Sequence, residues 1–174
     1  GLETQLPVRK KAAARKITPK TVLILAQQKH TDQDHYVSLV TFNNDAKTVY
    51  ECVGVNEVME LNGETYQPNC CTALYDAMGK SLSILRKKVA ADDKVLVTIV
   101  TDGCENASYE YSGAAIKALV DELKAAGWVF AYIGANHNVE AFAAQISITN
   151  VMQFHADSVG TQMMSQRTND ARTR

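Results

Sequence analysis

At 174 residues, with 46% hydrophobic and 21% charged residues, the chain has the size and composition of one globular domain with a sizeable core. Its formal net charge is −1, whereas a domain that attracts nucleic acid or an anionic membrane through its overall charge is strongly basic. Binding of that kind by the domain as a whole is therefore excluded. No apolar run approaches the roughly 18 residues of a membrane-spanning helix. Four cysteines are too few for a disulfide scaffold, so we expect reduced thiols in a cytoplasmic protein.

The first twenty residues are strongly basic. Their cationic side chains are Arg9, Lys10, Lys11, Arg15, Lys16 and Lys20, and no acidic residue follows Glu3 in this stretch. This basic segment is not followed by the apolar stretch and the small-residue cleavage site of a signal peptide, so the sequence does not predict one. We predict that residues 1–20 form a solvated, flexible arm, with no nucleic acid expected and contact with a polyanion as the weaker alternative, and that residues 21–174 form a single domain.

After residue 35 the pattern alternates between strand and helix. Apolar and β-branched residues with period-two spacing predict a strand over 36–42, and the Asn-Asn-Asp turn at 43–45 predicts a hairpin with a second strand over 48–53. A short helix is expected at 56–60. The segment 72–88 has apolar residues at helical spacing and ends in two lysines, which predicts a longer helix.

The second half of the chain continues the alternation. A nearly unbroken apolar run over 94–101 is typical of a central strand that is buried on both faces. The further elements that we predict are a helix over 112–126 capped by Gly127, a strand over 128–133, a helix over 139–145, a strand over 149–154 and a terminal helix from residue 158. Together they predict an α/β fold with a doubly wound, mostly parallel sheet that carries one antiparallel edge strand. Ligands are then expected beyond the carboxyl ends of the strands.

Three segments resemble one known family. The sequence CTALYDAM at 71–78 resembles the signature in which a threonine opens the helix after the hairpin, and VTIVTDGCENAS at 97–108 resembles a buried strand that ends in Thr-Asp-Gly. The later YIGANHNVEAFAAQ at 132–145 is also similar. All three resemble segments of von Willebrand factor A-type (vWA) domains, the last of them those of bacterial and phage proteins, and the resemblance covers roughly residues 21–165. It implies a Rossmann-like binding module, without catalytic activity, that docks a protein partner.

The resemblance also implies a metal-ion-dependent adhesion site at the top of the sheet. Thr72 matches the family's hydroxyl ligand, and Asp102 matches the carboxylate that binds the metal directly or through water. Hard oxygen donors in an octahedral shell suit Mg²⁺, whose free position takes a carboxylate from the partner protein.

Simpler roles compete with ligation at both positions. Thr72 also suits a helix N-cap, and Asp102 followed by Gly103 also suits an ordinary turn. The polar residues of the following loop, Glu105, Asn106 and Ser108, are expected to be surface and capping residues.

The family's first metal loop, Asp-x-Ser-x-Ser, is absent from the sequence. The family's first strand is central, and the only apolar run upstream is 21–25, which would lie between the strands at 36–42 and 94–101. A crossover between parallel neighbours needs about a dozen residues, and 26–35 is barely that long. Four explanations for the missing metal loop remain open. The site is degenerate, the chain carries a deletion, the sequence as printed omits a loop, or a helix that starts at Thr18 replaces the first strand. We therefore expect Mg²⁺ to bind weakly or not at all.

Other constellations in the sequence are weaker. A zinc site built from Cys70, Cys71 and Cys104 matches no common spacing. A cysteine nucleophile needs an adjacent base, for which His137 is the nearest candidate, although we expect His137 to face solvent. Two alternative functions stay open: a small-molecule or hydrolytic enzyme on a similar sheet, and a structural subunit whose missing strand comes from a partner chain.

Overall fold

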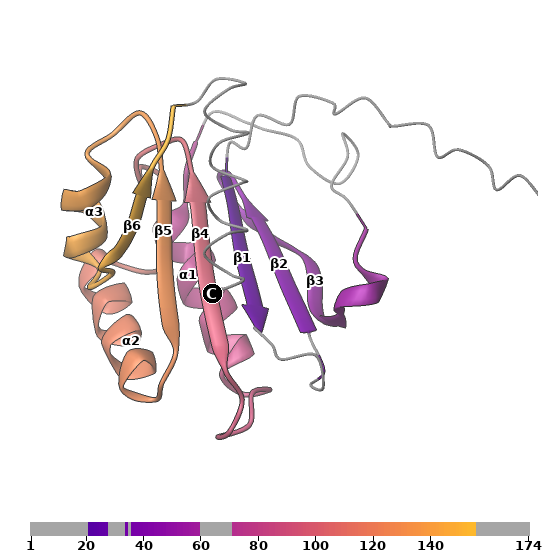
Figure 1. Ribbon diagram of the computed structural model, residues 1–174. Helices are drawn as coiled ribbons and strands as arrows, with labels where there is room; N and C mark the ends of the chain where they lie inside the picture. Colours follow the sequence, from indigo (N-terminus) through magenta and orange to yellow (C-terminus); the bar gives the residue numbers. More distant parts are fainter. Residues whose placement is uncertain (1–20, 28–33, 35, 60–70, 156–174) are drawn as a thin grey trace, which may run out of the picture.

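The computed structural model describes residues 21–27, 34, 36–59 and 71–155, and it shows a mixed α/β fold (Figure 1). The α/β class predicted from the sequence is confirmed. The basic segment 1–20, Cys70 and the terminal helix predicted from residue 158 lie outside the described residues.

The strands follow the apolar runs closely. They are β1 (Thr21–Gln27), β2 (Tyr36–Phe42), β3 (Ala46–Gly54), β4 (Val95–Thr101), β5 (Val129–Gly134) and β6 (Asn150–Gln153). They form one sheet in the order β3-β2-β1-β4-β5-β6. The apolar run at 21–25 is therefore a central strand, as predicted, and the alternative helix is wrong for this run.

The direction of β1 differs from the prediction. β1 is antiparallel to both neighbours, with Thr21 opposite Thr101 and Gln27 opposite Val95, and Figure 1 shows it pointing against β4, β5 and β6. Three of the five strand pairings are antiparallel, so the expectation of a mostly parallel sheet with one antiparallel edge strand is wrong. The physical reason is the short connection to β2, because a parallel neighbour needs a crossover of about a dozen residues.

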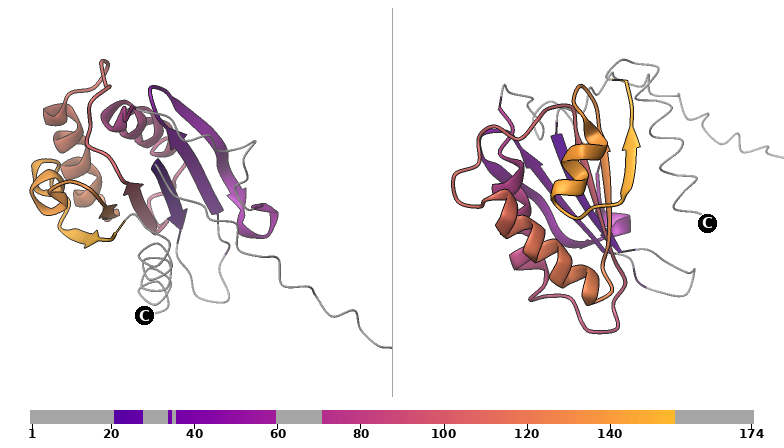
Figure 2. Two further views of the ribbon diagram at one scale, coloured as in Figure 1. Left: turned by 90° about the horizontal axis from the view of Figure 1, so that it is seen from above. Right: turned by 90° about the vertical axis from the view of Figure 1, so that its left-hand side faces the viewer.

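The helices cover one face of this sheet. They are α1 (Leu74–Leu85), α2 (Gly113–Ala125) and α3 (Val139–Gln145), and a short 3-10 turn, η1 (Val55–Glu57), follows β3. Seen from above in Figure 2, α1, α2 and α3 lie on the same side of the strands. Among the described residues no helix lies on the other face, so the two-sided arrangement that defines a doubly wound sheet stays a prediction.

The main core lies between the three helices and this face. Fully buried side chains from both layers meet there, including Met78 and Leu82 of α1, Ile99 of β4 and Tyr132 of β5. The α2 helix begins at the Ser112 cap, whose hydroxyl accepts from the Ala115 amide, and is followed by a left-handed glycine at 127. Such capping residues and apolar periodicity are local signals, which explains why these elements could be predicted closely.

None of the helices in the described part of the chain is both long enough and apolar enough to cross a membrane.

Candidate functional site

Four loops meet at the edge of the sheet where β2, β4 and β5 end. Thr101 and Gly134 are register partners at the ends of β4 and β5, and the Ala135 amide donates to the Thr101 carbonyl at 3.1 Å. From the other side, the Ala73 amide donates to the Asn43 carbonyl at 2.7 Å and so joins the start of α1 to the β2–β3 turn. Backbone hydrogen bonds therefore hold this edge together.

The two sequence-predicted metal ligands lie at this edge. A Cβ placed on Gly103 would lie 2.9 Å from the Thr72 Oγ1 atom, so Thr72 directly faces the residue that follows Asp102. The carbonyl of Asp102 accepts a hydrogen bond from the Asn136 side chain at 3.4 Å, which ties it to the β5–α3 loop. The loops that carry the hydroxyl and the carboxylate thus converge on one end of the sheet.

Thr72 does not cap α1. The N-cap is Ala73, which makes no side-chain capping bond, and the helix starts one residue later. The Thr72 side chain is only 6% exposed, and no hydrogen bond joins its hydroxyl to another described residue. A role for Thr72 as the cap of α1 is therefore wrong, and its role as a ligand stays a prediction.

The loop after β4 supplies the caps that α1 lacks. The Asn106 side chain accepts from the Thr72 amide at 2.9 Å, Glu105 accepts from the Tyr75 amide at 2.8 Å, and Ser108 accepts from the Asp76 amide at 3.1 Å. Glu105 also accepts from the Ser108 hydroxyl at 2.8 Å. The prediction that Glu105, Asn106 and Ser108 are loop and capping residues is confirmed for their capping role.

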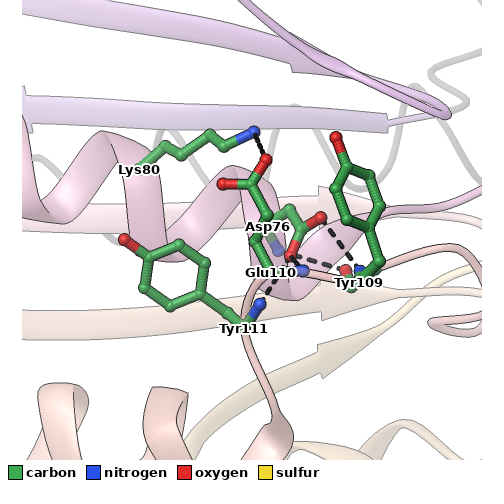
Figure 3. Close-up of polar contacts among 6 residues, drawn as sticks. Asp76, Lys80, Tyr109, Glu110 and Tyr111 are labelled. Carbon is green, nitrogen blue, oxygen red and sulfur yellow. Dashed lines mark hydrogen bonds and ion pairs between the residues drawn. The ribbon is translucent and has the colours of Figure 1, made fainter.

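Asp76 makes the reciprocal contact, from the first turn of α1 back to the loop. Its carboxylate accepts from the backbone amides of Tyr109, Glu110 and Tyr111 at 3.1, 3.0 and 2.8 Å (Figure 3). Burial by itself raises the pKa of this carboxyl, but the three amides and the Lys80 charge outweigh it and lower the pKa below its usual 3.8. Asp76 therefore holds the loop as a carboxylate.

Sequence reasoning missed Asp76. The available signal was an acidic residue in the first turn of a predicted helix on its apolar side, where it is 3% exposed. A charge in such a position needs a dedicated set of donors. The sequence does not reveal that these donors come from a loop more than thirty residues later.

His137, which was expected to face solvent, is half-buried, and both of its ring nitrogens contact the chain. Its Nδ1 lies 2.6 Å from the Ala135 carbonyl and its Nε2 lies 3.1 Å from the Tyr132 hydroxyl. A carbonyl oxygen only accepts, so Nδ1 carries a proton. Burial, with smaller effects from Cys104, Tyr75 and Glu105, raises the pKa of the Tyr132 hydroxyl, which keeps this donor protonated. Both ring nitrogens are engaged, so His137 is not a free base for a cysteine nucleophile.

The two predicted ligands do not by themselves fill an octahedral Mg²⁺ shell. Thr72 and Asp102 provide two oxygen-bearing side chains, whereas the missing first loop would provide two further hydroxyls. β1 cannot bring such a loop here, because its carboxyl end, Gln27, pairs with Val95 at the opposite end of β4. No group of three or more His, Cys, Asp or Glu side chains within the described residues has the arrangement of a metal site, which includes Cys71 and Cys104 of the zinc hypothesis.

Comparison of the chain with protein-family models, with curated proteins and with solved structures gave no match. The vWA resemblance therefore rests on the three sequence segments.

An engineered disulfide tests the convergence of the two loops. The Thr72 Cβ lies 4.0 Å from the position of a Cβ on Gly103, within the range that disulfides span. We expect the pair Thr72→Cys and Gly103→Cys to form a disulfide with oxidised glutathione when the four native cysteines are replaced by serine, as measured by mass spectrometry after alkylation. The control pair Thr72→Cys and Gly54→Cys should stay reduced, because Gly54 ends β3 at the other end of the sheet. Two free thiols in the first pair would show that the loops do not converge.

Proposed function

We propose that the chain is a protein-interaction module of vWA type that binds its partner at the edge formed by Thr72, Asp102 and the loop around Asn136. The module acts without a catalytic step and without a required metal ion. The fold is the vWA variant of a doubly wound sheet, with β1 reversed and the metal loop lost. The observation that carries the proposal is that the Thr72 hydroxyl directly faces Gly103, the residue after Asp102, where an added Cβ would lie only 2.9 Å from it.

The rigidity of this edge supports a docking role. The loop after β4 exchanges hydrogen bonds with α1 in both directions, through Glu105 to the Tyr75 amide and through Asp76 to the Tyr111 amide. A preorganised loop loses little conformational entropy when a partner binds. Asn136 is exposed at this edge, and its side chain donates to the Asp102 carbonyl.

The engagement of His137 speaks against the hydrolytic alternative. A nucleophilic cysteine needs a base whose nitrogen is free to take its proton. His137 instead holds the Tyr132 hydroxyl and the Ala135 carbonyl.

Site-specific photo-crosslinking tests the proposed docking edge. A photo-reactive amino acid at the exposed Asn44, in the β2–β3 turn, should give a discrete adduct with a protein in an extract of the source cells. The same amino acid at the exposed Asp92, at the opposite end of the sheet, should give none. The Asn44 adduct should disappear in Asp102→Ala and should be equally strong in Mg²⁺ and in a chelator.

Each outcome of this experiment bears on one part of the proposal. Equal labelling from Asn44 and Asp92, or an Asn44 adduct that survives Asp102→Ala in a variant with unchanged circular dichroism, would remove the docking edge. If the adduct is lost in the chelator, partner binding requires a metal ion. That result would contradict the proposal that the two side chains of Thr72 and Asp102 act without one.

A further inference from the structure

The loop after β4 carries two tyrosines that lie in different surroundings. The Tyr111 ring packs against the main core and lies against Gly79 of α1. The Tyr109 ring is 75% exposed, the highest value among the large hydrophobic side chains of the described residues. Figure 3 shows the two rings leaving the loop in different directions. Folding therefore leaves one aromatic ring in water, on a loop of the proposed docking edge.

The backbone beneath the exposed ring is fixed. The Tyr109 amide donates to the Asp76 carboxylate at 3.1 Å, and the next two amides of the loop donate to the same group. Because Asp76 is 3% exposed, water competes little for these bonds. A tyrosine has few rotatable bonds, so a ring on a fixed backbone loses little conformational entropy when it is bound. Tyrosine is also enriched among the residues that contribute most to binding energy.

The loops around this ring are negatively charged. The segments 43–45, 71–73, 102–112 and 135–138 form the edge, and they contain no lysine or arginine and four acidic residues, Asp45, Asp102, Glu105 and Glu110. One cation reaches the ring from α1. The Lys80 Nζ atom lies 5.9 Å from the centroid of the Tyr109 ring and 2.6 Å from the Glu110 carboxylate. The chain thus already places one cation against this ring.

The charges next to the ring act on the Tyr109 hydroxyl. The pKa of this hydroxyl is raised above its usual 10.0, mainly by Glu110, and Asp45 adds a smaller effect in the same direction. Lys80 lowers the pKa, but its effect is smaller than that of Glu110. The surroundings of the ring therefore remain negative although Lys80 is present, and they attract a further positive charge.

We propose that the Tyr109 ring binds an arginine side chain of the protein partner, with the guanidinium stacked on the ring beside the Glu110 carboxylate. This inference rests on the proposed docking role of the edge and names the chemistry of the partner. A guanidinium is planar, stacks on aromatic faces and offers several N–H donors to carboxylates. A lysine ammonium is a compact and strongly hydrated charge. The site therefore prefers arginine to lysine.

Titration of the full chain with a short arginine peptide tests this preference. The probe is acetyl-Gly-Arg-Gly-amide, and binding is measured by the shifts of the amide NMR signals of Tyr109 and its neighbours. The matched probes carry lysine or the uncharged citrulline in place of arginine. We expect the arginine peptide to bind about threefold more tightly than the lysine peptide, and the citrulline peptide to cause no shift. Equal binding of the arginine and lysine peptides, or binding of the citrulline peptide, would overturn the inference.

Substitutions locate the peptide on the ring. Tyr109→Leu removes the aromatic face and should weaken binding of the arginine peptide about fivefold, whereas Tyr109→Phe should keep most of the affinity. Tyr36→Leu is the matched control and should change nothing, because Tyr36 is 46% exposed at the opposite end of the sheet. Lys80→Met removes the cation that already lies over the ring, so binding should become about threefold tighter. Unchanged binding in Tyr109→Leu, or weaker binding in Lys80→Met, would contradict the proposed site.

The crosslinking experiment separates this inference from the proposed function. If the Asn44 adduct requires Asp102 but is unchanged in Tyr109→Leu, the docking edge stands and the role of Tyr109 is overturned. If the arginine peptide binds in a Tyr109-dependent manner but Asn44 gives no adduct, the specificity of the ring is supported and the docking edge is not.

Discussion

Replacing Asp76 with alanine is expected to lower the free energy of unfolding by about 3 kcal/mol, because three backbone amides lose their acceptor at once. The two other carboxylates of this loop are already engaged, Glu110 with Lys80 and Glu105 with the amides of Tyr75, Ala107 and Ser108. Urea denaturation followed by the fluorescence of the single, buried tryptophan, Trp128, measures the loss.

Two further substitutions show whether the buried carboxylate itself is responsible. Asp76→Asn keeps the shape and one acceptor, so we expect a smaller loss than in Asp76→Ala. Asp121→Ala removes an exposed carboxylate that pairs with Lys117 on α2 and should change the stability little. Equal losses in Asp76→Ala and Asp121→Ala would contradict a special role for Asp76.

The same interaction predicts a pH dependence with a definite sign. The folded-state pKa of Asp76 lies below the usual 3.8, so its contribution is complete at neutral pH, where the carboxyl is ionised in both states. Below 3.8 the unfolded chain takes up the proton first, and the contribution is lost as the pH falls through the folded-state pKa. The stability difference between the unsubstituted protein and Asp76→Asn should therefore shrink on acidification. A difference that grows with acid would mean that the folded-state pKa is raised.

Local signals explain how much of the fold could be predicted from the sequence. The strand over 36–42 and the helix over 139–145 were predicted with the bounds that the structure has, because period-two and helical apolar spacing mark them directly. The direction of β1 was not predicted, because the family resemblance implied a parallel strand. The length of its connection to β2 argued against that direction and was the better guide.

At the candidate site, too, the features that local sequence patterns encode were predicted, and those that depend on long-range contacts were not. Motif spacing placed Thr72 and Asp102 at one edge, and the structure brings their loops together. The engagement of His137 and the role of Asp76 depend on contacts with Tyr132 and with the loop at 109–111, which no local pattern encodes. Tertiary hydrogen bonds of this kind become visible only when the elements are assembled.

Replacing Gly79 with alanine is expected to destabilise the protein by about 2 kcal/mol, although alanine is the better helix former. Helix propensity alone favours alanine in the middle of α1 by about 1 kcal/mol. A Cβ on Gly79, however, would overlap the ring of Tyr111. That ring packs against the main core and its backbone amide is held by Asp76, so it has little room to move away. Overpacking against a fixed neighbour costs roughly 1–3 kcal/mol beyond any propensity gain, so the steric effect should win.

A double-mutant cycle separates this overlap from other effects of the substitution. If the Tyr111 ring is the obstacle, Gly79→Ala should cost much less in a Tyr111→Ala background, with a coupling on the order of 1–3 kcal/mol in urea denaturation. Gly54→Ala is the matched control, because a Cβ there meets only the flexible Glu57 carboxylate at 3.4 Å. Additive losses at Gly79 and Tyr111 would show that they do not share one packing site. Because Asp76 fixes the loop that carries Tyr111, Gly79→Ala should also cost less in Asp76→Ala, which links the helix glycine to the carboxylate that orders the docking edge.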